Sequence, residues 1–193
     1  MKKIALVICI FLISISCKHE NKNDRSSDHE HEVKVSETET KKTLSPHTSE
    51  MAVIDGAHIH IDYSSPGVRN RMIFGGLLAY DEVWQAGAHR ATWIETDKDL
   101  EIEGKLLEAG KYGFFVIPSQ ENAWTLIFNT HWDQHGKDEY NKDQDVLRVK
   151  AEPSKNDSLT EHLTYTIEQT GDDTGMIRMS WENQSIQIPF KVI

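Results

Sequence analysis

The sequence predicts an all-β fold, a single-domain antiparallel β-sandwich whose two sheets follow the jelly-roll or immunoglobulin-like architecture. From residue 51 to the C-terminus, short runs of apolar, aromatic and β-branched residues recur at intervals of about 8–12 residues. Gly, Pro, Asn and Asp stand between these runs and predict turns. Only residues 80–85 and 133–141 have a composition that suits a short helical turn.

The first clear strand covers residues 57–63, where apolar and polar side chains alternate strictly. Successive side chains of a strand point to opposite faces, so this segment has one apolar and one polar face. The apolar face consists of Ile59, Ile61 and Tyr63, and the polar face consists of His58, His60 and Asp62.

The later strands follow from the same pattern, with turn-forming residues between them. The expected strands are residues 72–74, 91–96, 100–103, 111–117, 124–129, 145–152, 162–169, 175–181 and 185–192. Trp124 and Trp181 lie inside strand patterns, so we expect both in the core. The polar residues 182–184 predict a turn between the last two strands.

The N-terminal segment has the layout of a bacterial secretory signal. Lys2 and Lys3 precede an unbroken apolar run over residues 4–13, and a small residue stands directly before Cys17. The apolar run is too short for a transmembrane helix, which needs about 20 apolar residues. We therefore expect a signal peptide over residues 1–16.

The cysteine after the small residue resembles the lipobox of bacterial lipoproteins, although Ser14 stands where Leu is usual. The resemblance implies cleavage before Cys17 and a lipid on its thiol. A cleaved signal without lipid is the alternative. The expected location is the bacterial cell envelope, with the protein exported and anchored through this lipid, at the periplasmic or surface face of the outer membrane.

Residues 17–50 are polar and mixed in charge after Cys17, and they lack aromatic side chains. Such a segment cannot bury enough apolar surface to offset its conformational entropy, so we expect a flexible linker. The folded domain is expected over residues 51–193. The formal net charge of −10 argues against nucleic acid as a partner, because nucleic-acid binding selects basic surfaces.

The expected domain contains no cysteine, because Cys9 lies in the signal and Cys17 carries the lipid. The core must therefore hold the fold without a disulfide. Thiolate metal sites and cysteine nucleophiles are excluded on the same ground. The sequence also lacks the serine-hydrolase, zinc-protease, phosphate-loop and dinucleotide motifs, so we predict no catalytic residue and expect binding rather than turnover.

Several motifs together resemble one known family, the domain of unknown function 2911. They are IDYSSPGVRNRMIFGGL (61–77), VWQAGAHRAT (83–92), IEGKLLEAGKYGFFVIP (102–118), WTLIFN (124–129) and DVLRVK (145–150). The resemblance implies a compact β-sandwich that is secreted or lipid-anchored in Gram-negative bacteria, and it implies no reaction, substrate or catalytic residue. Many members of the family carry Asn where this chain has His89.

Histidines suggest a metal site. His58, His60 and Asp62 share one face of a strand, where side chains two apart are about 6–7 Å from each other. This spacing would allow a shared metal ion. The alternative is that these residues form the solvent-exposed face of an edge strand.

Three further histidines lie in two other segments. His131 and His135 are four residues apart, which would place both rings on one face of a helical turn. His89 lies in an expected loop, where binding residues concentrate. The metal hypothesis combines His89, His131 and His135 with His58 or His60, and the expected ion is zinc or copper because both bind neutral imidazole.

Aromatic residues suggest a different kind of ligand. Trp132 lies in a polar segment close to Tyr140, and an exposed indole can stack on a sugar ring. The rival hypothesis is therefore a carbohydrate or envelope-component binding module that uses these two residues. The alternative for Trp132 is packing over the edge of the sandwich. A third hypothesis is a scaffold that binds another, unidentified envelope protein through a sheet edge.

Two arginines complete the candidate residues. We expect Arg71 and Arg148 to form ion pairs with acidic neighbours such as Asp62 or Asp145. The alternative is that Arg71 or Arg148 binds an anionic ligand.

Overall fold

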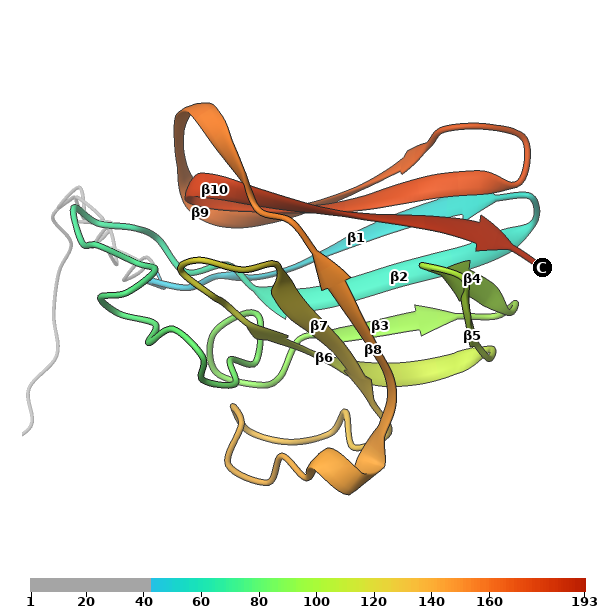
Figure 1. The fold of residues 1–193 in the computed structure, drawn as a ribbon, viewed down its shortest axis with the longest axis horizontal. Helices are drawn as coiled ribbons and strands as arrows, with labels where there is room; N and C mark the ends of the chain where they lie inside the picture. Colours follow the sequence, from blue (N-terminus) through green and yellow to red (C-terminus); the bar gives the residue numbers. More distant parts are fainter. Residues whose placement is uncertain (1–42) are drawn as a thin grey trace, which may run out of the picture. The chain divides into compact units, whose positions relative to one another are not determined.

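The computed structural model describes residues 43–193, which fold into two antiparallel sheets packed as a β-sandwich (Figure 1). The predicted fold class is therefore confirmed. The six-stranded sheet has the order β1 (His47–Ile54), β2 (Ala57–Ser64), β3 (Trp93–Thr96), β6 (Gly110–Ile117), β7 (Trp124–Asn129) and β8 (Asp145–Ala151). The four-stranded sheet has the order β5 (Lys105–Leu107), β4 (Leu100–Ile102), β10 (Thr174–Val192) and β9 (Ser154–Gln169).

β10 contains a reversal of chain direction at Glu182, whose φ of 56° lies in the left-handed region. Because of this reversal, the Val192 amide donates to the Asp173 carbonyl at 2.8 Å. The two halves of β10, before and after Glu182, therefore lie side by side. Gly175 in the first half lies against the Phe190 ring in the second, and a Cβ at position 175 would meet that ring at 2.2 Å. The predicted turn at residues 182–184 is thus present.

The alternation in β2 has the predicted consequence. Ile59, Ile61 and Tyr63 are buried between the sheets, and His58 on the opposite face is exposed. Burial of each such apolar side chain contributes about 1.5–3 kcal/mol. Trp124 and Trp181 are both buried, as expected.

β1 is an edge strand, and all of its residues before Ile54 are exposed or half-buried. The strand begins at His47, ahead of the expected domain start at Met51. The sequence pattern did not predict this strand, because an edge strand buries only part of one face and can carry many polar residues. Its outward face continues the polar face of β2, since Met51 pairs with His60.

Neither of the two segments that suited a short helical turn forms a helix. Residues 80–85 and 133–141 form turns and isolated bridges, and the short helix of the described chain is the 3₁₀ helix η1 (Lys142–Gln144). The Asn141 side chain caps η1 by accepting from the Asp143 amide at 3.0 Å. Within residues 43–193, no helix has the length and apolarity that a membrane crossing requires.

Two long loops meet beside the six-stranded sheet, the first between β2 and β3 and the second between β7 and η1. The Gly136 amide donates to the His89 carbonyl at 2.7 Å, and the Ala91 amide donates to the Gln134 carbonyl at 3.1 Å. Thr92 fixes the base of the first loop, because its buried hydroxyl donates to the Ala86 carbonyl at 2.9 Å. These bonds hold both loops next to the outer face of the sheet.

Candidate functional site

The outer face of the six-stranded sheet, which points away from β9 and β10, carries a cluster of aromatic and charged side chains. The strand register places Trp93 of β3 between Asp62 of β2 and Gly113 of β6. Lys111 lies two residues before Gly113 on β6, and Trp132 comes from the loop after β7. We call Trp93, Lys111 and Trp132, with the hollow described below, the outer-face site.

Gly113 explains why Trp132 can reach the sheet. A Cβ at this position would lie 3.2 Å from the Trp132 Cα and 3.1 Å from the His131 carbonyl oxygen. The loop therefore lies directly on the backbone of β6, which only a residue without a side chain permits. This approach brings the Trp132 ring centroid to 6.4 Å from that of Trp93, with an interplanar angle of 67°.

The ammonium group of Lys111 lies over both indole rings. Its nitrogen is 3.3 Å from the Trp93 ring centroid and 4.0 Å from the Trp132 ring centroid. Contacts of this kind are worth about 0.5–2 kcal/mol each, depending on desolvation. His60 contacts Trp93 edge to face at 4.7 Å between centroids, so Trp93 has neighbours from β2 and β6.

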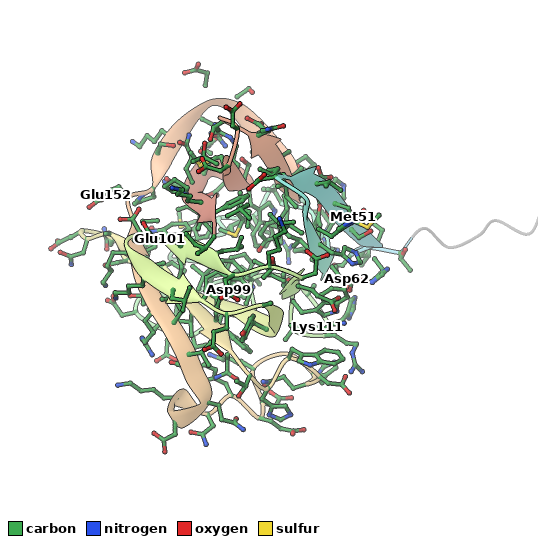
Figure 2. The ribbon with its side chains drawn as sticks, turned by 90° about the vertical axis from the view of Figure 1, so that its right-hand side faces the viewer. Met51, Asp62, Asp99, Glu101, Lys111 and Glu152 are labelled. Atoms are coloured by element: carbon green, nitrogen blue, oxygen red, sulfur yellow. The ribbon has the colours of Figure 1, made fainter. Side chains whose placement is uncertain are left out.

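A polar hollow of about 80 Å³ opens beside Trp93. Its lining includes the ionisable side chains of His47, Asp62 and Arg90. The His47 ring nitrogen Nε2 lies 2.9 Å from the Asp62 carboxylate, and Arg90 forms an ion pair with Asp133. Figure 2 shows Asp62 and Lys111 on the same side of the molecule. The hollow thus places hydrogen-bonding groups next to an aromatic surface.

A buried polar network anchors the loop that carries Trp132. Asp145 is 4% exposed at its side chain and accepts from Asn129 Nδ2, Tyr140 Oη and Arg148 Nη1, each at 2.8 Å. Asn129 is fully buried, and its Oδ1 accepts from the His131 amide at 2.8 Å. The network therefore fixes the backbone immediately before Trp132.

Tyr140 belongs to this network rather than to an exposed surface. Its ring packs against Phe115 at 5.0 Å between centroids. Burial, followed by the hydrogen bond to the Asp145 carboxylate, raises the pKa of Tyr140 to about 12. The Tyr140 hydroxyl, which was a candidate for ligand binding, is thus already engaged with Asp145 and Arg148.

The ion pair predicted between Arg148 and Asp145 is present at 2.8 Å. The prediction for Arg71 is wrong. Its guanidinium donates to the carbonyls of Gly67 at 2.7 Å and Val68 at 3.0 Å, so it braces the chain after β2. Those backbone carbonyls satisfy Arg71 in place of a carboxylate.

The candidate histidines lie in two regions, His58 and His60 on β2 and the other three on the two loops that meet at the bridge between Arg90 and His135. His58 is exposed on β2, and His60 packs against Trp93. His131 lies 3.7 Å from Glu139, and the exposed His135 lies 3.7 Å from Asp138. His131 and His135 do not share a helical face, because their segment forms turns.

His89 has a backbone explanation. Its φ of 62° lies in the left-handed region, where Asn and His are enriched among residues other than glycine. Within the described part of the chain, no three His, Cys, Asp or Glu side chains are grouped to hold a metal ion, so the metal hypothesis has no geometric support there.

The sequence did not single out four members of the outer-face site, which are Trp93, Lys111, Arg90 and His47. They lie on different strands and loops, and only the register brings them together. Trp93 and Lys111 could have been found in part from the sequence, because both lie in strands that the sequence predicted. Cys17 lies outside the described residues.

Comparison with known proteins gives a family but no function. No curated protein and no solved structure matches the chain. A family model described as a protein of unknown function, DUF2911, matches residues 45–190, which include every strand except the last two residues of β10. The expected family is confirmed, and the chain belongs to the DUF2911 family.

Proposed function

We propose that this domain is a binding module that recognises a carbohydrate of the cell envelope at the outer-face site. The observation that carries the proposal is the position of Trp93 and Trp132. Two half-buried indoles from separate segments lie together on an outward face, beside a polar hollow. Aromatic side chains kept at a surface, with polar groups beside them, are typical of recognition sites.

The chemistry of the hollow suits sugar hydroxyls. Asp62 offers carboxylate oxygens as acceptors, and Arg90 offers guanidinium donors. Both already have partners in the described chain, Asp62 in His47 and Arg90 in Asp133. The indole rings offer an apolar surface for the C–H face of a sugar ring.

The experiment is a titration of the full-length protein with hexamers of glucose, N-acetylglucosamine, glucosamine and galacturonic acid, followed by tryptophan fluorescence. Saturable binding of at least one hexamer supports the proposal. Trp132→Ala is expected to weaken that binding at least tenfold, and Trp132→Phe is expected to retain part of it.

A matched control separates the site from the rest of the surface. Lys150 is an exposed lysine of β8 on the same sheet, and its ammonium group donates to Thr125. Lys150→Met should leave glycan affinity unchanged. Binding that survives Trp132→Ala intact, or the absence of binding to all four hexamers, would remove the support for this function.

We also propose that the protein reaches the envelope as a lipoprotein. The support is the signal-like layout of residues 1–16 and the position of Cys17. The membrane is then the first partner of the protein, through the lipid. Mass spectrometry of the mature N-terminal peptide should find a diacylglyceryl group on Cys17, and Cys17→Ser should move the protein from the membrane to the soluble fraction.

A further inference from the structure

Lys111 has two kinds of partner within reach. In the register of β3 and β6 it stands directly opposite Glu95, and the Cβ atoms of such pairs lie about 4.5–5.5 Å apart. Within residues 43–193, no carboxylate lies within 4.0 Å of the Lys111 ammonium group. The nitrogen lies instead over Trp93 and Trp132. The indole pair thus holds an ammonium group although a carboxylate is available on the neighbouring strand.

The geometry of the two rings suits a cation. An indole carries negative potential on its face and attracts a cation within about 6 Å of its centroid. Trp93 and Trp132 come from different segments, and both direct a face at the same nitrogen, at 3.3 and 4.0 Å. Two rings whose faces contact the same cation form part of an aromatic cage, the arrangement that recognises ammonium ligands.

The charges around the rings also favour a cation. Asp62 and Asp133 are already paired with His47 and Arg90. Glu95 is exposed on the same face and has no ion-pair partner in the described part of the chain. The chain has a formal net charge of −10, which attracts cations and repels anions at long range.

We propose that the outer-face site selects glycans that carry free ammonium groups, such as deacetylated amino sugars. The ammonium group of the ligand replaces that of Lys111 between Trp93 and Trp132, and Glu95 is available to a second ammonium group. This inference rests on the proposed function of glycan binding. Lys111 then acts as an internal competitor that the ligand displaces.

The test compares two hexamers that differ only in charge and acetylation. Full-length protein is titrated with the glucosamine hexamer, at a pH where its amines are protonated, and with the N-acetylglucosamine hexamer. We expect the glucosamine hexamer to bind about tenfold more tightly. Lys111→Met should tighten its binding further, by about threefold to tenfold, because the competitor is gone. The control Lys150→Met removes the same charge elsewhere and should not tighten binding.

A third variant separates the cage from simple charge attraction. Trp132→Ala should abolish the preference for the glucosamine hexamer, because one of the two rings is lost. A preference that survives Trp132→Ala would show attraction by net charge alone and would overturn the inference. Weaker binding of the glucosamine hexamer to Lys111→Met would overturn it as well, because Lys111 would then contact the ligand directly.

The remaining outcomes distinguish the two proposals. Equal binding of both hexamers, or binding of the acetylated hexamer alone, overturns the ammonium preference and leaves glycan binding standing. Binding of neither hexamer overturns the ammonium preference. If the glucose and galacturonic acid hexamers also fail to bind, glycan binding falls with it.

Discussion

Replacement of Asp145 by alanine should destabilise the domain strongly, because this buried carboxylate accepts from three side chains. The substitution leaves the donors of Asn129 and Tyr140 without their acceptor, and it leaves the Arg148 guanidinium, 33% exposed, without its counter-charge. Loss of one partner of a buried ion pair costs about 3–5 kcal/mol, and unsatisfied neutral donors add to this cost. Because Arg148 retains some contact with water, we expect about 3–4 kcal/mol in total.

Urea denaturation followed by tryptophan fluorescence measures this change in the free energy of unfolding. Asp138→Ala is the matched control, because this exposed carboxylate has only a 3.7 Å contact with His135. It should change stability by less than about 0.5 kcal/mol. Hydrogen exchange should also accelerate at the His131 amide in Asp145→Ala, since Asn129 loses its anchor. A loss below about 1 kcal/mol for Asp145→Ala would refute the assignment of this network as the anchor of the Trp132 loop.

Three other predictions follow from single residues. Gly113→Ala should push the Trp132 loop off β6 and weaken glycan binding, and it should also lower stability because the new Cβ would meet the buried Phe115 ring at 2.9 Å; unchanged affinity in the same titration would show that the close approach is dispensable. His89→Asn should raise the free energy of unfolding by a few tenths to about 1 kcal/mol, because Asn tolerates the left-handed φ; a loss of stability would indicate a role for the imidazole. The folded pKa of Tyr140, about 12, lies above its ordinary value of 10.0, so its contribution to stability is complete below pH 10 and is lost as the pH rises towards 12. The stability difference between the wild type and Tyr140→Phe should therefore shrink over that range in urea titrations, and a constant difference would contradict the assigned pKa.

Local sequence patterns predicted much of the fold. The alternation in β2 identified both of its faces, and the turn residues at 182–184 identified the reversal inside β10. These signals are reliable because they depend on neighbours in the chain. β1 escaped detection since an edge strand with polar residues buries little of its surface.

The candidate site was harder to predict because it depends on register. Trp132 was singled out, but its partners Trp93 and Lys111 were not, and no local pattern indicates that β3, β6 and the loop after β7 meet. The histidine hypothesis failed to gain support for a related reason. A spacing of four residues has meaning on a helix, and the segment between His131 and His135 forms turns instead.

The most direct measurement of the central claim is the set of tryptophan indole N–H signals in a ¹H–¹⁵N NMR spectrum of the protein during glycan addition. The signals of Trp93 and Trp132 report on the outer-face site, and those of the buried Trp84, Trp124 and Trp181 report on the core. We predict that the first two signals shift with saturation while the three core signals stay in place. Binding without movement of the Trp93 and Trp132 signals would contradict the assignment of the outer-face site.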